Sequence, residues 1–401
     1  MGRFLMAWEF GSGLGHAGRM APLARSLIER GHQVDVVLKE VVHTQPMFKG
    51  VPVRIFQAPV WMHRTVGLPN PQATLAEIVL GAGYLKADSL GALVGAWRSL
   101  MQATQADAVI ADYAPSALIA AHIEGLPTAA LGIGFYVPPD VAPIPPFRIW
   151  EPLQQGRVEY HDQQALDVVN EVVQAGGAQP LRKLAWIFRG DRPLLCTWPE
   201  LDHYGRGELP PGERYFGPSF SPASGVAPQW PEGTGPKVFA YIRHVHPDHL
   251  SVLQALVAKG CRTLVYMPEV SAGQPAPLIS PLIHYSSGPV HMQQVLQDCA
   301  LLVCHAGAGT MNEALLAGVP VLMLPAQAEQ FLIAMRVQHT GAGINAAQQS
   351  RPPQFKAMID TLLDRPEHRA AAQAMARQHG SFSHEQQTRD LVAEFEALLA
   401  R

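Results

Sequence analysis

Twice in this chain, a short apolar run leads into a glycine-rich loop that is followed by apolar residues at helical spacing. The first occurrence runs from residues 3–8 through the loop GSGLGH at 11–16. The second runs from residues 300–304 through the loop HAGAGT at 305–310. A strand, a tight loop and a helix in this order begin a βαβ unit, so each occurrence predicts a parallel sheet covered by helices.

The length and composition allow two such domains. The chain has 401 residues, of which 48% are hydrophobic and only 16% are charged, which is enough apolar material for two packed cores. A stretch rich in Gly and Pro at 213–236 predicts a linker. We therefore expect an N-terminal Rossmann-like domain over 1–212, a linker over 213–236, a C-terminal Rossmann-like domain over 237–382, and a helix over 383–401 that packs back on the first domain. Strands are expected at 3–8, 34–38, 51–56, 108–111, 128–133, 238–243, 262–267, 300–304 and 319–324, and helical patterns at 73–104, 116–124, 248–259, 309–317 and 385–399.

The charge balance and the cysteines narrow the class of protein. With 30 Lys and Arg against 33 Asp and Glu, the formal net charge is −3, and no basic cluster predicts a nucleic-acid partner. The 4 cysteines form no CxxC pair and are expected to be buried thiols in a reducing compartment. No signal peptide and no apolar run of about 20 residues is found. We expect a cytoplasmic protein without a transmembrane segment, with peripheral membrane contact left open.

The second glycine loop is suited to bind phosphate. A helix that starts after a strand presents free N–H groups and roughly half a positive charge to an anion. Thr310 adds a hydroxyl, and His305 at the strand end can donate an imidazole N–H. The alternative is a plain strand-to-helix turn with Thr310 as N-cap.

The segment HAGAGTMNEALLAGVPVLMLPAQAEQ resembles the donor-nucleotide signature of inverting, metal-independent nucleoside-diphosphate-sugar glycosyltransferases of GT-B fold. The resemblance implies two Rossmann-like domains facing across a cleft and a UDP- or dTDP-linked hexose as co-substrate, without a further cofactor. Ser287 stands where many plant relatives have a Trp on the nucleobase, and Gly309 stands where they have Asn. The residues implied for the donor are His305, Gly307, Gly309 and Thr310 at the diphosphate, Glu313 at the ribose, Glu329 and Gln330 at the sugar, and Val290 at the base; Arg243, after the first strand of this domain, is a further candidate for the diphosphate.

The first glycine loop resembles the opening of the same family, in which a His after the first strand is the catalytic base. By that resemblance His16 is the base, and the segment ADAVIADYAPSALIAAHIEGLPTAALGIGF places Asp112 as the carboxylate that orients it. Imidazole titrates near neutral pH, and a carboxylate on its far nitrogen fixes the tautomer. The family usually has Pro three residues after the His, whereas this chain has Arg19. Taken singly, either residue can be a helix start or a strand-end cap.

No DxD pair is present to hold a divalent cation, so we expect no metal and a leaving group stabilised by protein dipoles. Retaining GT-B enzymes carry two glutamates eight positions apart in the second domain. Glu151 with Glu159 and Glu200 with Glu208 have this spacing but precede that domain. Inversion in a single displacement is therefore favoured.

The acceptor is not defined by the sequence beyond its class. Aromatic residues after expected strand ends favour a small-molecule or lipid-like acceptor, although each of them can equally pack in the core. These candidates are Trp61, Phe135, Tyr136, Phe147 and Trp150.

Three other functions compete. A dehydrogenase is possible because residues 13–18 fit GxGxxG, with Glu40 about 20 residues further on, but this fingerprint alone is weak. A sugar-nucleotide epimerase of the same architecture would use the donor without an acceptor. A non-catalytic activator protein would be expected to lack His16 or His305, and both are present.

Overall fold

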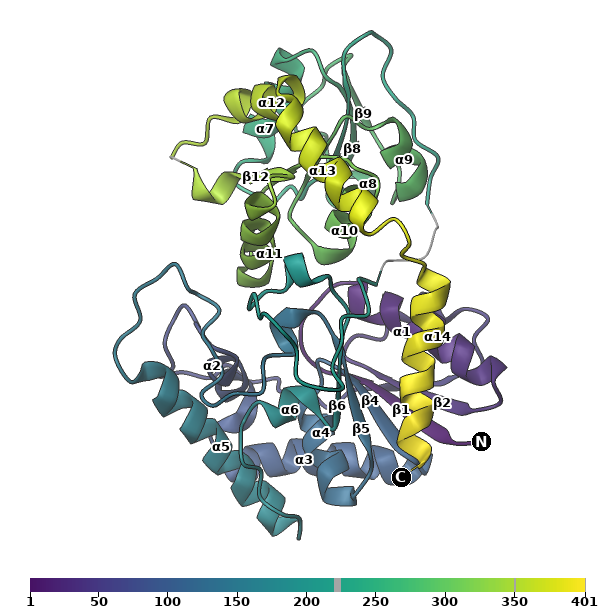
Figure 1. The fold of residues 1–401 in the computed structure, drawn as a ribbon, viewed down its shortest axis with the longest axis vertical. Helices are drawn as coiled ribbons and strands as arrows, with labels where there is room; N and C mark the ends of the chain where they lie inside the picture. Colours follow the sequence, from purple (N-terminus) through teal and green to yellow (C-terminus); the bar gives the residue numbers. More distant parts are fainter. Residues whose placement is uncertain (220–224, 350, 401) are drawn as a thin grey trace. The chain divides into compact units, whose positions relative to one another are not determined.

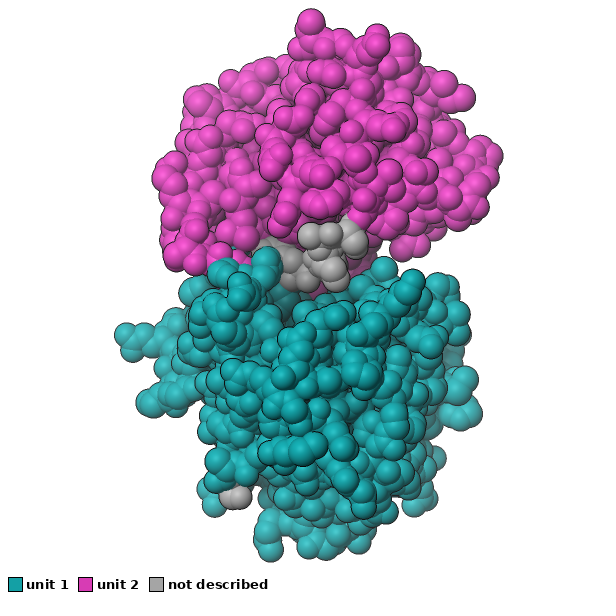
Figure 2. Space-filling model, turned by 90° about the vertical axis from the view of Figure 1, so that its right-hand side faces the viewer, with its two compact units in different colours: residues 1–219, 383–401 teal, residues 220–382 magenta. Residues whose placement is uncertain are grey.

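The computed structural model describes residues 1–219, 225–349 and 351–400, and the chain divides into two compact units (Figures 1 and 2). Unit 1 comprises 1–219 together with 383–401, and unit 2 comprises 220–382. The described part of the expected linker is thus shared between the units: 213–219 lies in unit 1, and 225–236 lies in unit 2.

Unit 1 is built on a six-stranded parallel sheet in the order β3-β2-β1-β4-β5-β6. Its central strands are buried almost throughout, which explains why they are apolar runs without alternation. The strands are β1 (Arg3–Trp8), β2 (Gln33–Leu38), β3 (Arg54–Gln57), β4 (Ala108–Asp112), β5 (Thr128–Gly132) and β6 (Arg192–Leu195). The helices are α1 (Gly15–Glu29), α2 (Leu75–Val79), α3 (Ala87–Thr104), α4 (Pro115–Glu124), α5 (Arg157–Ala175), α6 (Trp186–Arg189) and α14 (His384–Glu396).

The last helix, α14, belongs to unit 1 although almost the whole of unit 2 precedes it in the chain. Figure 1 shows it beside α1, and the two helices pack against each other. Leu391, Val392 and Phe395 of α14 join the apolar cluster that contains Leu27 of α1 and Phe4 of β1. This burial of one helix face is what holds the C-terminal segment in place.

Unit 2 repeats the topology with a second six-stranded parallel sheet, in the order β12-β11-β10-β7-β8-β9. Counted from its own first strand, this order is 3-2-1-4-5-6, as in unit 1 and as in dinucleotide-binding domains. The strands are β7 (Lys237–Tyr241), β8 (Arg262–Tyr266), β9 (Ile283–Tyr285), β10 (Leu301–Cys304), β11 (Val321–Met323) and β12 (Gly343–Asn345). The helices are α7 (His249–Ala258), α8 (Pro268–Ser271), α9 (Met292–Asp298), α10 (Ala308–Leu316), α11 (Ala328–His339), α12 (Phe355–Asp364) and α13 (Pro366–Gln378).

The prediction of one helical pattern over 73–104 is wrong in detail. The helix is broken between α2 and α3 by a short π-helical segment, η2 (Leu80–Tyr84), in which Ala82 and Gly83 leave helical geometry. Gly83 has φ +99°, and a Cβ there would lie 3.0 Å from the Trp61 ring, so the break lets an aromatic ring approach the backbone.

Within the described residues, no one helix is both long and apolar enough to cross a membrane. Only the segments Leu75–Tyr84 and Ala87–Thr104, taken together and bent by 84°, reach the necessary length and composition.

Candidate active site

Counted along the chain, the first and fourth strands of each sheet are neighbours, and the strand order reverses between them. In unit 1 these are β1 and β4, where Trp8 pairs with Asp112. In unit 2 they are β7 and β10, where Tyr241 pairs with Cys304. Open parallel sheets bind ligands outside the carboxyl ends of the strands at this switch point.

His16 and Asp112 meet at the switch point of unit 1. His16 lies in the first turn of α1, and its Nδ1 is 2.8 Å from Oδ1 of Asp112, the last residue of β4. A carboxylate only accepts hydrogen bonds, so Nδ1 carries the proton and Nε2 carries the lone pair. Both side chains are buried, with 10% and 1% of their surface exposed. The pair thus has the geometry of a base held in one tautomer by a carboxylate.

The surroundings of His16 fix the plane of its ring. Trp8 stacks on the imidazole with the ring centroids 5.0 Å apart and the planes 16° apart. On the Nε2 side, Gly11 has φ +79°, and a Cβ there would lie 2.5 Å from Nε2. A glycine at position 11 therefore leaves room for the ring nitrogen that carries the lone pair.

Arg19, which the sequence shows only as a departure from the family pattern, is part of this cluster. Its Nη1 donates to Oδ2 of Asp112 at 2.9 Å and to the hydroxyl of Tyr136 at 2.8 Å. Burial opposes the charge most strongly, but Asp112, Tyr136 and Cys196 together outweigh the burial and raise the pKa of Arg19. Asp112 is thus held at both oxygens, one by His16 and one by Arg19. A long basic residue one turn after the expected base, on the same helix face, was the available sequence signal.

In each sheet, the strand that carries the switch point, β4 or β10, is followed within two residues by a non-glycine residue whose φ lies in the left-handed region. Tyr113 follows Asp112 with φ 52°, and Ala306 follows His305 with φ 60°. Such residues are rare outside glycine and concentrate at functional sites, where the surrounding structure holds them. Tyr113 is held by stacking on Tyr136, with the ring centroids 4.6 Å apart.

The N-terminus of α10 lies at the switch point of unit 2, directly after β10. Gly307 is the N-cap, and no side chain caps the helix, so the alternative of Thr310 as N-cap is wrong. Among the described residues, no hydrogen bond engages the N–H groups of Ala308, Gly309 and Thr310 or the Thr310 hydroxyl. These donors and the helix dipole are therefore available to an anion.

Glu313, one turn further along α10, is a half-buried carboxyl group. Burial raises its pKa to about 7, and no hydrogen-bond partner is found among the described residues. A carboxyl group in this state is suited to accept hydrogen bonds from ligand hydroxyls.

His305 lies at the end of β10, but both of its ring nitrogens already have main-chain partners. Nε2 accepts from the Arg243 N–H at 2.7 Å, and Nδ1 donates to the Leu324 carbonyl at 3.2 Å. The imidazole therefore has no N–H left for a phosphate in this arrangement. The Arg243 guanidinium pairs with Glu269 at 2.8 Å and keeps half of its surface exposed.

Glu329 and Gln330 lie in the first turn of α11, just after β11, which is the neighbour of β10. Gln330 accepts the N–H of Ala326 at 2.9 Å through Oε1, which leaves its amide N–H groups for a ligand. Val290 is buried and forms a bridge with Val226. The Pro289 carbonyl accepts from the Val226 N–H, and the His291 N–H donates to the Val226 carbonyl. Of residues 289–291, Val290 is therefore the one whose main-chain groups stay available to a base.

Of the aromatic acceptor candidates, three are buried and serve packing in this structure. Phe135 and Phe147 contact each other with the ring centroids 5.1 Å apart, and Tyr136 lies between Tyr113 and the His16 ring. Trp61 and Trp150 keep part of their surface exposed. A role in acceptor binding stays a prediction for all five.

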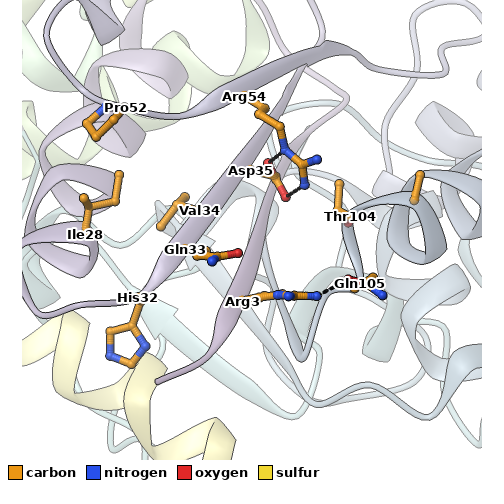
Figure 3. A pocket seen from close by; sticks show the side chains of 11 residues that line it. Arg3, Ile28, His32, Gln33, Val34, Asp35, Pro52, Arg54, Thr104 and Gln105 are labelled. Carbon is orange, nitrogen blue, oxygen red and sulfur yellow. Dashed lines mark hydrogen bonds and ion pairs between the residues drawn. The ribbon is translucent and has the colours of Figure 1, made fainter.

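The hollow in Figure 3, of about 440 Å³, lies at the opposite edge of the sheet of unit 1. Its lining comes from the amino ends of β1, β2 and β3 and from the end of α3. There Arg54 pairs with Asp35 through two hydrogen bonds of 2.7 Å, and Arg3 bonds Gln105. Because it lies away from the carboxyl ends of the strands, it is not the candidate active site. Among the described residues, no group of three His, Cys, Asp or Glu side chains is arranged to hold a metal ion.

Comparison with known proteins agrees with this arrangement. Residues 285–394 match the model of the erythromycin biosynthesis protein CIII-like C-terminal domain. The chain is 26% identical over 404 residues to 4'-demethylrebeccamycin synthase of Lentzea aerocolonigenes, covering 90% of this chain and 92% of the relative.

Two solved structures share the fold over the whole chain. The glycosyltransferase VinC in complex with dTDP superposes with a TM-score of 0.67 at 16% identity, covering 100% of both chains. The spinosyn rhamnosyltransferase SpnG complexed with spinosyn aglycone gives a TM-score of 0.66 at 19% identity, covering 99% of this chain and 100% of SpnG. The predicted fold is confirmed: this chain has the GT-B fold, and its sequence is similar to the EryCIII-like C-terminal domain over residues 285–394 and to an antibiotic biosynthesis enzyme over most of its length.

Proposed function

We propose that this protein transfers a hexose from a UDP- or dTDP-sugar to a hydroxyl group of a small-molecule or lipid-like acceptor, with inversion at the anomeric carbon and without a metal ion. The observation that carries the proposal is the buried hydrogen bond between His16 and Asp112 at the switch point of unit 1. Relatives that bind dTDP or an aglycone support the choice of substrates.

His16 would act as the base. Its Nε2 takes the proton of the acceptor hydroxyl while the oxygen attacks the anomeric carbon and the bond from that carbon to the diphosphate breaks. Asp112 does not take the proton. It stabilises the imidazolium that forms and keeps Nδ1–H directed at Oδ1.

The departing diphosphate would gain negative charge at the N-terminus of α10. The free N–H groups of residues 308–310 and the Thr310 hydroxyl are donors already in place for this charge. Glu313 would accept hydrogen bonds from the ribose hydroxyls. Glu329 would accept hydrogen bonds from the sugar hydroxyls, and the amide of Gln330 would donate hydrogen bonds to them.

A panel of UDP- and dTDP-sugars with polyketide-like and lipid-like alcohols tests the proposal, with transfer measured by mass spectrometry and the anomeric configuration by NMR. We expect β-linked product from an α-linked donor, unchanged rates in EDTA, and loss of transfer of at least about 1,000-fold in His16→Ala. Nucleotide binding should stay intact in that variant. Retention of configuration would contradict the proposal.

The same panel separates the competing functions. Conversion of the donor sugar without an acceptor would indicate an epimerase. Thermal protection by NAD and none by UDP or dTDP would indicate a dehydrogenase.

A further inference from the structure

We infer that Arg19 is a positioning residue of the active site, which holds Asp112 in place and offsets its charge so that His16 is free to accept a proton. This inference rests on the proposed role of His16. It assigns a function to the residue that stands where the family pattern has Pro.

The contacts of Arg19 leave it little freedom. It has 9% of its side chain exposed, and one Nη1 atom joins Oδ2 of Asp112 to the Tyr136 hydroxyl. These partners come from the end of β4 and from the turn after β5, so Arg19 ties two strand ends to α1. With Oδ2 held in this way, Oδ1 stays directed at His16.

The charges around this cluster decide what Arg19 does to the base. Asp112 contributes one negative charge from β4 and Arg19 one positive charge from α1. Among the described residues, the other titratable groups that interact with Arg19 are Tyr136 and the buried Cys196. Burial raises the pKa of the Cys196 thiol to about 11, so this group is neutral. The Asp112–Arg19 pair is therefore close to neutral overall. A lone carboxylate in the same place would hold a proton on the adjacent imidazole more strongly.

The experiment is the pH dependence of kcat/KM for transfer by the full chain, compared among the wild type, Arg19→Met and Arg19→Lys. In Arg19→Met we expect the acid limb to move up by about one pH unit and kcat to fall about tenfold or more. Arg19→Lys keeps the positive charge, so the acid limb of its kcat/KM profile should lie close to that of the wild type. Arg25→Met, an exposed position on the same helix, is the matched control and should change neither quantity.

The outcomes separate this inference from the proposed function. A wild-type chain with no transfer, or one that keeps activity in His16→Ala, overturns the role of the base itself. An active wild type with an Arg19→Met profile that is lowered but not shifted overturns the inference, because that result is typical of a structural role. If Arg19→Met does not fold, Arg19→Gln, which also removes the charge, takes its place, and a profile that is lowered but not shifted overturns the inference in the same way.

An independent observation in unit 2 carries a second inference. Both ring nitrogens of His305 are hydrogen-bonded to main-chain groups. If an imidazole N–H binds the diphosphate in unit 2, it must therefore come from another histidine. The His246 ring lies beside it, with the ring centroids 5.4 Å apart, and His246 has 8% of its surface exposed. We propose that His246 Nε2–H donates to the diphosphate of the nucleotide.

The tautomer of His246 supports this assignment. Its Nδ1 accepts the Asp248 N–H at 3.2 Å, so in the neutral ring the proton is on Nε2. No described residue accepts a hydrogen bond from that N–H. Burial and the neighbouring His305 lower the pKa of His246, which keeps the ring neutral and its tautomer single near pH 7. Arg351, Asp248 and His249 are the other charged or titratable groups that interact with it.

Titration calorimetry with the nucleoside diphosphate and the matching nucleoside tests this contact. In His246→Ala we expect about tenfold weaker binding of the diphosphate and unchanged binding of the nucleoside, since one hydrogen bond to a charged group is lost. His246→Gln, which keeps an N–H donor, should recover part of the loss, and the exposed His339→Ala is the control. Equal diphosphate affinity in His246→Ala and wild type overturns this inference alone. A wild type that binds no nucleoside diphosphate overturns the proposed function.

Discussion

At the scale of single residues, the site depends on the contacts that hold His16 and Asp112 together. His16 is confined by Trp8 on one face and by its bond to Asp112. The space for its Nε2 exists only because residue 11 has no side chain. Gly11 lies in the loop that leads into α1, and His16 lies in the first turn of that helix.

Gly11→Ala should therefore displace the base. Gly13→Ala is a matched control, because Gly13 also has a positive φ, of 87°, but a Cβ there would meet nothing within 4 Å. Both variants carry the backbone strain, whereas only the first moves His16. We expect about a 100-fold lower kcat in Gly11→Ala than in Gly13→Ala, with equal nucleotide affinity, measured by steady-state kinetics and calorimetry. Equal kcat in the two variants would contradict this account.

Glu313 gives a prediction about pH. Burial raises its pKa to about 7, so the folded protein holds this proton more tightly than the unfolded chain, and stability falls as pH rises from about 4.5 through 7. Ribose hydroxyls donate to the charged form, so binding favours loss of the proton.

We expect the affinity of the donor's nucleoside, which has no titrating phosphate, to rise by about threefold to tenfold between pH 6 and 8. Isothermal titration calorimetry measures it. Glu313→Gln should flatten this dependence, and a slope that survives in Glu313→Gln would exclude Glu313 as its cause.

At the scale of elements, α14 shows how a segment late in the chain stabilises an early domain. Phe395 is fully buried in the apolar cluster of unit 1, and ion pairs from Glu396 to Arg30 and from Glu394 to Arg192 surround it. Those ion pairs are partly exposed and contribute little, so the apolar contact dominates.

Phe395→Ala should lower the free energy of unfolding of unit 1 by about 3–5 kcal/mol through the lost contact and the cavity. Phe355→Ala, at a buried position in the core of unit 2, should instead destabilise unit 2. Calorimetry or denaturant titration with a probe in each unit distinguishes the two. If both variants lower the same transition, the units do not unfold independently.

The elements that the sequence predicted are those whose pattern is local. The runs at 3–8 and 108–111 are buried except for Arg3, which is partly exposed, and the structure has β1 and β4 there within one residue. Strands β6, β9 and β12 have three or four residues each and were not predicted, because so short a pattern does not stand out from a loop. The break between α2 and α3 was missed because it depends on a ring from residue 61 packing on Gly83.

At the scale of the whole molecule, two units of one topology carry different chemistry at the same place in the sheet. The switch point of unit 1 holds the hydrogen-bonded pair of His16 and Asp112, and that of unit 2 holds the N-terminus of α10 and the Glu313 carboxyl group. If unit 2 alone binds the nucleotide, its stability should depend on that ligand and the stability of unit 1 should not.

A nucleoside diphosphate at 100 times its Kd should stabilise unit 2 by about 2.7 kcal/mol, and NAD should have no effect. Differential scanning calorimetry of the full chain measures this, with His16→Ala as a control that should show the same shift. A shift confined to unit 1, or lost in His16→Ala, would place the nucleotide at the first glycine loop instead.

The sequence by itself determined the two strand–loop–helix units and the parallel sheets, because these depend on patterns within a few residues of one another. The candidates His16, Asp112 and residues 305–313 came from the resemblance of their segments to a known family. Only the tertiary structure decided that Arg19 occupies the second oxygen of Asp112 and that main-chain groups occupy both nitrogens of His305. A hydrogen bond between residues 93 or 62 positions apart leaves no mark on local periodicity. It exists because the sheet brings the ends of β1 and β4, and of β7 and β10, side by side.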